Sequence, residues 1–382
     1  MISRGVATFT LDTGRCPRWL FERMVRLGHD LVRAIVIEEG PEAVVERLGD
    51  PVWFQSLGTV LAFDWNASGL TTILTAALKE AIRGEESELG IFICGGKGKT
   101  SRKTPQEILT WGDRLGLPES RASHLVYTSK MTAKVDSALV QDGFQLYHHS
   151  FFFTRSGAWT VVQQGMNTGA GTARRYHWHS KQARDLVSDP HAGIMSDVRL
   201  PSVLNLTAPA SEATRTTSTE LVSQRFPSLL KDLVLLSKHV TPLSKMARFR
   251  IGSGPAVGGA SQLTLLELED TEFRHHPVEG EDFARNKYLQ KILWRLCDEQ
   301  PATYEKLLST EGVGAKTVRA LALVAEMIYG AKPSYEDPAR YSFAFGGKDG
   351  TPYPVDRTTY DRTVALLRRY VPRSQKRARL VE

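Results

Sequence analysis

The chain has 382 residues, of which 41% are hydrophobic and 24% are charged. These proportions are those of a globular protein and exclude global disorder, and the length favours two domains. No apolar run approaches the roughly 18 residues of a membrane helix, and no secretory signal is visible, so we expect a cytoplasmic protein without a membrane partner. The three cysteines, Cys16, Cys94 and Cys297, lie too far apart in sequence for a zinc ribbon or a disulfide framework.

The formal net charge of +7 fits a polyanionic partner without requiring one. Positive charge is concentrated in the segment 362–379, which contains seven Arg and Lys residues and no acidic residue. Such a segment can neutralise phosphates and release their counterions. A solvated basic helix end is an equally good interpretation of the same residues.

Apolar periodicity and turn residues predict a first domain of mixed α and β structure. We expect helices over 17–49, 71–82, 105–115 and 130–141. A buried strand is expected over 89–94, followed by the glycine-rich loop 95–98. The segments 146–153 and 158–164 flank Thr154–Gly157 and predict a β-hairpin.

Strand signals thin out after about residue 180, so we expect a second domain that is mostly helical. Helices are predicted over 220–239, 283–298, 304–308, 315–329 and 358–370. Loops are predicted over 211–219, which is rich in Ser and Thr, and over 251–262, which is rich in Gly, Ser and Ala. The fold class is therefore α+β, with a mixed α/β domain over 1–185 and an α-helical domain over 186–382.

The residues 307–321 resemble a helix-hairpin-helix motif, in which two short helices flank a turn of the form Gly-apolar-Gly. Glycines permit a tight turn and let backbone N–H groups approach a phosphate, and the start of the next helix adds its dipole. Such a turn contacts backbone rather than bases, so it implies DNA without implying a sequence. The predicted DNA-binding residues are Gly312, Val313, Gly314, Lys316, Thr317 and Arg319.

The alternative is that Gly312 and Gly314 only end one helix and begin another. If the turn binds phosphate, bulkier residues at both glycines should weaken binding to all duplex sequences alike. We expect such changes to cost little in folding.

Polar and aromatic residues are concentrated between Lys134 and His179, at a density unusual for a core. We expect one cleft to contain Asp136, His148 or His149, the pair Gln163 and Gln164, and Arg174 or Arg175. The first five are candidate catalytic residues and the two arginines are candidate DNA contacts. A metal-dependent nuclease is one interpretation, although the spacing matches no metal-ligand signature. A structural role for each histidine is the other.

The C-terminal part also resembles the helix-hairpin-helix DNA glycosylase superfamily, in which a hairpin lysine precedes an aspartate at the start of a helix. Here Asp356 follows Lys316 by 40 residues, a longer interval than in that family, and the family's histidine is missing. The resemblance implies that the Lys316 amine attacks C1′ of a damaged nucleotide and that Asp356 stabilises positive charge on the sugar. The alternative is that Lys316 only contacts a phosphate and that Asp356 only caps a helix.

Over most of its length the chain resembles domain-of-unknown-function family 763. The resemblance is carried by the segments 50–58, 95–98, 141–149, 163–167, 173–178 and 354–356. It implies little chemistry, so the expected function depends on the hairpin.

Together these features predict a DNA-repair protein that acts on damaged DNA as a glycosylase or abasic-site lyase. One alternative is a DNA nuclease with its active site in the first domain, and another is a DNA-binding module without catalysis. No cofactor is expected, and a divalent metal is expected only for the nuclease. The predicted partner is DNA, and the sequence defines no oligomeric state.

Overall fold

A computed structural model describes residues 11, 16–63, 67–239, 283–339, 361 and 365. Asp356 and the predicted loop 251–262 lie outside the described residues, as does nearly all of the segment 358–379. The catalytic roles that the glycosylase resemblance implies for Lys316 and Asp356 therefore stay predictions.

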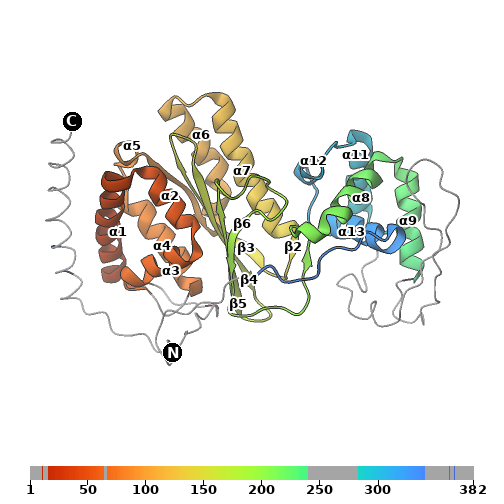
Figure 1. Cartoon of the computed structure of the whole chain (residues 1–382), viewed down its shortest axis with the longest axis horizontal. Coiled ribbons are helices and arrows are strands. Elements are labelled where there is room, and N and C mark those ends of the chain that lie inside the picture. The colour runs from red at the N-terminus through yellow and green to blue at the C-terminus, as the bar shows by residue number, and fades with distance from the viewer. Residues whose placement is uncertain are drawn as a thin grey trace.

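Five antiparallel strands form the central sheet, in the spatial order β1-β3-β4-β5-β6 (Figure 1). They are β1 (Ile91–Lys97), β3 (Gln145–Thr154), β4 (Trp159–Asn167), β5 (Thr172–His179) and β6 (His191–Met195). The predicted β-hairpin is the β3–β4 pair, in which Phe152 lies opposite Thr160. Strands β5 and β6 were not predicted. In β5, residues Arg175–His179 alternate polar and aromatic side chains, which is a strand pattern that our prediction did not use.

Successive side chains of a strand point to opposite faces, so each strand supplies residues to two layers. On one face Ile93, Phe152 and Val162 pack against the N-terminal helices. These are α1 (Arg18–Glu39), α2 (Pro41–Gly49), α3 (Pro51–Val60) and α4 (Ala67–Ala81). On the other face Phe151 and Val161 belong to a cluster shared with α6 (Thr104–Leu115) and α7 (Glu119–Ala138). The short α5 (Glu86–Leu89) precedes β1, and the 3-10 helix η1 (Gly98–Lys103) follows it.

Beyond α7 lies a group of helices, as Figure 1 shows. Its members are α8 (Glu212–Ser223), α9 (Phe226–His239), α11 (Lys287–Glu299), α12 (Tyr304–Ser309) and α13 (Ala315–Tyr329). A two-stranded sheet of β2 (Val140–Gln141) and β7 (Leu204–Asn205), followed by η2 (Pro209–Ser211), connects this group to α7. One apolar cluster runs from the sheet through α7 to α13, so the two parts share a core. The α+β fold class is confirmed.

The stretch 211–219, predicted as a loop, lies mostly in helix α8, so that prediction was wrong. The reason is that its polar side chains are used in packing. The Thr214 hydroxyl donates to the Ala331 carbonyl at 2.7 Å, and Arg215 donates to the Leu206 carbonyl at 2.7 Å. Tertiary contacts of this kind override the low helix propensity of Ser and Thr. None of the described helices combines the length and the apolarity that crossing a membrane requires.

Candidate functional site

Residues 310–314, which we call the hairpin, connect α12 to α13. Gly312 has φ +87°, in the left-handed region, and Val313 is 4% exposed and belongs to the apolar core. Gly314 is the N-cap of α13. The local sequence therefore folds as expected, with two helices flanking a turn that is anchored by its apolar residue.

The two glycines are not equivalent. A Cβ on Gly312 would lie 2.3 Å from Ile292 Cδ1 and would require a side chain at a positive φ, whereas a Cβ on Gly314 would meet nothing within 4 Å. We expected both glycines to be replaceable at little cost to folding. The structure supports this for Gly314 and contradicts it for Gly312.

Side chains of neighbouring elements donate hydrogen bonds to carbonyl oxygens in the hairpin and at the start of α13. Lys134 Nζ donates to the Thr310 carbonyl at 2.9 Å, Arg295 to the Glu311 carbonyl at 3.1 Å, and Gln141 Nε2 to the Ala315 carbonyl at 3.0 Å. Burial lowers the pKa of Lys134, since the charged form loses solvation. These contacts fix the hairpin against α7, β2 and α11.

Backbone donors remain at the start of α13. Within the described part of the chain, the N–H groups of Gly314, Ala315 and Lys316 have no hydrogen-bond acceptor. The Lys316 side chain is exposed, and its Nζ lies 5.9 Å from the centre of the Phe283 ring. Thr317 is 4% exposed, so its side chain faces the core rather than the surface. The exposed groups at the start of α13 are backbone donors and a cation, which can bind an anion, and Glu311 of the preceding turn adds an exposed carboxylate.

A cluster of hydrogen-bonded polar side chains, which we call the polar constellation, is buried between α7 and the sheet. Asp136 is 0% exposed and accepts hydrogen bonds from Gln163 Nε2 at 2.5 Å and Trp178 Nε1 at 3.0 Å, while its other oxygen lies 2.5 Å from His191 Nε2. Gln163 Oε1 lies 2.9 Å from Nδ1 of His149. A continuous set of hydrogen bonds therefore joins four neighbouring strands, β3 to β6, on one face of the sheet.

Strand alternation places the other predicted residues on the opposite face. His148 Nε2 lies 3.2 Å from the Thr75 hydroxyl of α4, and Gln164 Nε2 donates to the Ser68 carbonyl at 2.9 Å. Arg175, which is 0% exposed, donates to Gln55 Oε1 at 3.0 Å. The residues expected in one cleft are thus divided, with Asp136, His149 and Gln163 on one face and His148, Gln164 and Arg175 on the other.

Arg174, predicted as a DNA contact, is also 0% exposed. Its guanidinium donates to Asp142 Oδ2 at 2.9 Å and to both oxygens of Asp337 at 2.9 and 2.8 Å. Neither Arg174 nor Arg175 has side-chain surface with which to reach a phosphate. Arg174 instead connects strand β5 to Asp337, which follows the helical part in sequence.

The buried histidines predict an acid-labile fold. Burial lowers the pKa of His148 to about 3, with smaller contributions from His149 and Lys97, and burial also lowers the pKa values of His149 and His177. Because the folded pKa lies below the unfolded value of about 6.5, stability is fully present above that pH and is lost below it. We expect the free energy of unfolding to fall by up to about 1.4 kcal/mol per pH unit for each such histidine.

Urea unfolding between about pH 7.5 and about pH 5 would measure this slope, in the range where histidines rather than carboxylates take up protons. His148→Gln removes one titrating group and should make the slope shallower by about 1.4 kcal/mol per pH unit. An identical slope in this variant would contradict the assignment of His148 as a neutral buried group.

A pocket of about 410 Å³ lies beside β6 at the edge of the sheet, and His191 is part of its wall. Arg199 and Asn205 also line it, together with Ser334 and residues 336–339. Asn205 belongs to β7, which pairs with β2, and Gln141 of β2 contacts the start of α13. Strands β7 and β2 therefore connect this pocket to the start of α13. Through His191 the pocket wall also contacts the buried carboxylate of Asp136.

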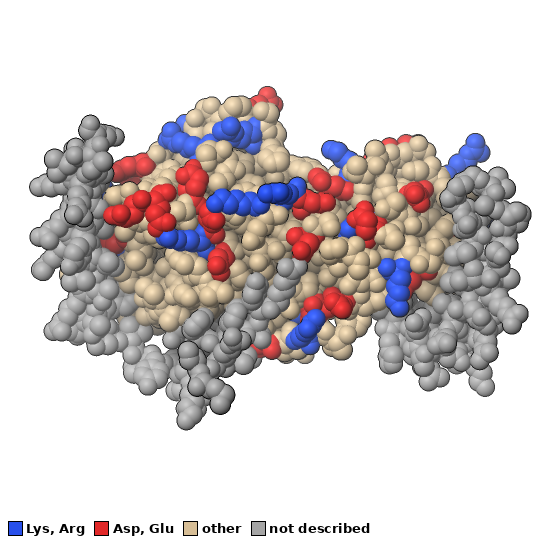
Figure 2. Space-filling model, in the orientation of Figure 1, with Lys and Arg blue, Asp and Glu red and all other residues tan. Residues whose placement is uncertain are grey.

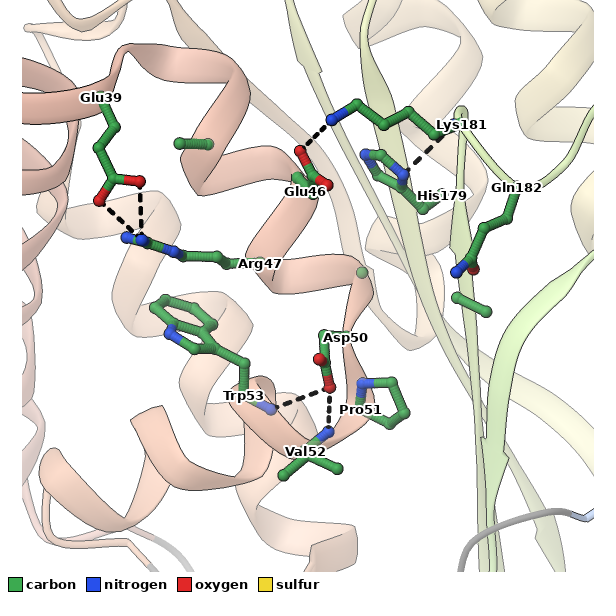
Figure 3. Close-up of a pocket in the computed structure, with 13 residues that line it drawn as sticks. Glu39, Glu46, Arg47, Asp50, Pro51, Val52, Trp53, His179, Lys181 and Gln182 are labelled. Atoms are coloured by element: carbon green, nitrogen blue, oxygen red, sulfur yellow. Dashed lines mark hydrogen bonds and ion pairs between the residues drawn. The ribbon is translucent and has the colours of Figure 1, made fainter.

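A larger pocket, of about 700 Å³, lies between α2, the start of α3 and the end of β5 (Figure 3). Arg47 donates to Glu39 at 2.6 Å, and Lys181 donates to Glu46. Asp50 caps α3 by accepting from the backbone N–H of Val52 at 2.7 Å. The charged side chains of this wall are therefore bonded to protein groups, and we assign no chemistry to it.

His191 and the exposed face of α11 were not among the predicted site residues. His191 is isolated in sequence and its partner Asp136 is 55 residues away, so no local pattern marks the pair. Lysines and an arginine recur every four residues at 287, 291 and 295, and this spacing was visible in the sequence. In the described part of the chain, no group of three or more His, Cys, Asp or Glu side chains could hold a metal ion.

The fold and these residues define an α+β protein with polar side chains in the sheet interior and backbone N–H groups without an acceptor, among the described residues, at the start of α13. The chain belongs to the family described as "Protein of unknown function (DUF763)", whose model matches residues 5–355. Neither the curated proteins nor the solved structures include a match to this chain. The family description names no activity, so the function is argued from the geometry.

Proposed function

We propose that this protein binds the backbone of DNA through the hairpin and the first turn of α13, and that it acts in DNA repair or processing. The observation that carries the proposal is the division of the hairpin's polar groups. Side chains of α7, α11 and β2 donate to the carbonyl oxygens of Thr310, Glu311 and Ala315, while the N–H groups of Gly314 and Ala315 have no acceptor among the described residues. An oxyanion of a phosphate would satisfy those donors.

The surface around the turn supports a phosphate backbone as the ligand. The space beside Gly314 is open, so a phosphate oxygen can approach the backbone, and the exposed Lys316 adds a positive charge. On the face drawn in Figure 2, acidic and basic side chains are interspersed rather than separated into one large basic field. Binding on that face would therefore depend on local contacts. Backbone contacts of this kind position a duplex without selecting a sequence.

Gly314→Val and Lys316→Gln are expected to weaken binding to unrelated duplex sequences by similar factors. Lys316→Gln should also reduce the slope of log affinity against log salt by about 0.9, the value for one lost phosphate contact. Fluorescence anisotropy at about 50 to about 200 mM salt measures both quantities. Glu311→Gln, which removes the acidic side chain of the hairpin, should act in the opposite direction.

Lys231→Gln is the matched control, because Lys231 is exposed on α9, and Figure 1 shows α9 and α12 on opposite sides of the helical group. It should leave affinity nearly unchanged. Equal thermal unfolding midpoints would show that Gly314→Val folds normally. If Gly314→Val and Lys316→Gln both kept the affinity and the salt slope of the wild type, DNA binding by the hairpin would be refuted.

A second candidate function is acid–base catalysis on DNA at the pocket of His191. The observation that favours it is the contact of His191 with the buried carboxylate of Asp136, because a carboxylate fixes the orientation and tautomer of a histidine. This candidate corresponds to a nuclease. The competing proposal is the glycosylase or lyase chemistry predicted for Lys316 and Asp356. A nuclease should lose turnover when His191 is replaced, and a lyase should lose turnover when Lys316 is replaced.

A further inference from the structure

Helix α11 has one buried and one exposed face. Leu289, Ile292, Leu293 and Leu296 are at most 4% exposed and face the core. The opposite face ends at the exposed Asp298 and, before that residue, carries Lys287, Tyr288, Lys291, Trp294 and Arg295 at helical spacing. We call these five residues the α11 face.

The aromatic residues of the α11 face are unusually exposed. Tyr288 is 67% exposed and Trp294 is 55% exposed, although both bury apolar area readily when a partner is present. Their neighbours along the same face are Lys287 and Lys291, which are exposed, and Arg295, whose side chain is 34% exposed. Aromatic rings interleaved with cations are the components of surfaces that bind single-stranded nucleic acid, since rings stack on bases and cations contact phosphates.

The α11 face is continuous with the hairpin. A Cβ on Gly312 would lie 2.3 Å from Ile292 Cδ1 and 3.5 Å from the Tyr288 hydroxyl, so the turn packs directly on this helix. Arg295 donates to the Glu311 carbonyl at 3.1 Å. A strand whose backbone is bound at the hairpin would therefore run onto the α11 face without crossing a gap.

We propose that the α11 face binds unpaired bases, with Tyr288 and Trp294 stacking on them and the three cations contacting their phosphates. This inference rests on the proposed binding of DNA by the hairpin and narrows its substrate class. The ligand is DNA in which a single strand continues from a duplex, the duplex backbone lying on the hairpin and the unpaired bases on α11. The exposed acidic side chains of Asp298, Glu299 and Glu311 lie at the C-terminal end of this surface, so the bound strand is expected over the part that holds Lys287, Lys291 and the two rings.

The test compares three probes: a duplex, a single strand of about 16 nucleotides, and a duplex with an overhang of that length. Each of Tyr288→Ala and Trp294→Ala should weaken binding of the single strand and of the overhang about 5- to 150-fold, since one base stacks for about 1–3 kcal/mol. Affinity for the blunt duplex should stay within a factor of two or so of the wild type. Tyr288→Phe and Trp294→Phe keep a ring and should restore most of the binding.

The outcomes distinguish the α11 inference from the proposal that the hairpin binds DNA. Loss of duplex binding in Gly314→Val, with unchanged single-strand binding in Trp294→Ala and Tyr288→Ala, would overturn the α11 inference and leave the hairpin proposal standing. A wild-type protein that binds none of the probes would overturn both. Because Tyr288 and Trp294 are exposed, both alanine variants should fold, and equal thermal midpoints would confirm that the losses arise from binding.

Discussion

Replacing Arg174 by methionine is expected to lower the free energy of unfolding by about 3–5 kcal/mol, the range for removing one partner of a buried ion pair. Arg174 is 0% exposed and donates to the carboxylates of Asp142 and Asp337, which are at most 5% exposed. Methionine fills similar space but leaves both carboxylates buried without their cation. Urea unfolding at neutral pH would measure the loss.

A triple variant separates the charge effect from the loss of packing. Arg174→Met combined with Asp142→Asn and Asp337→Asn removes the uncompensated charges, and should recover a large part of the lost stability. The Tyr176 hydroxyl, which donates to Asp142 at 2.7 Å, can donate equally to the amide oxygen of asparagine. A loss below about 1 kcal/mol in the single variant would mean that water reaches the site and that the carboxylates are not buried in solution.

The hairpin was predictable because its signals are local. Gly312, Val313 and Gly314 lie within three consecutive positions, and the helices on either side show apolar periodicity. The β3–β4 hairpin was predictable for the same reason, since Gly157 and its neighbours mark the turn between two apolar segments. In both cases the residues that determine the structure are adjacent in sequence.

The polar constellation was predictable as a group but not in its arrangement. Gln163 and Gln164 are neighbours on one strand, so strand alternation alone requires them to face opposite layers. Their division could have been predicted. The partners of Arg174 could not, because Asp337 is 163 residues away and no local pattern connects the two.

Burial decides what these polar residues can do. A guanidinium that is enclosed by carboxylates stabilises the junction between strand β5 and residue 337, and it is not available to DNA. His191 differs from the other members of the constellation because it lines a pocket as well as contacting Asp136. It is therefore the point at which the buried hydrogen-bonded chain can exchange a proton with a bound molecule.

The hydrogen bonds of Asp136 show which nitrogen atom of His191 carries the proton. Asp136 already accepts from Gln163 and Trp178, so the atom that faces its other oxygen, His191 Nε2, carries the hydrogen. In a neutral imidazole this leaves the Nδ1 lone pair as the acceptor, which can take a proton from an attacking water molecule. Asp136→Asn keeps the size of the side chain but presents an N–H group or a weaker acceptor to His191, and thereby disturbs the tautomer.

If His191 is the general base, His191→Gln and Asp136→Asn should each lower turnover of a DNA substrate about 10²- to 10⁴-fold, while DNA affinity remains that of the wild type. Steady-state cleavage of duplexes with an overhang and of abasic duplexes, together with anisotropy, would measure both properties. Lys316→Ala should then reduce affinity modestly and leave the turnover of bound substrate nearly unchanged. The opposite pattern supports the lyase: borohydride would trap the wild type and His191→Gln on abasic DNA but not Lys316→Ala, and His191 would have no catalytic role.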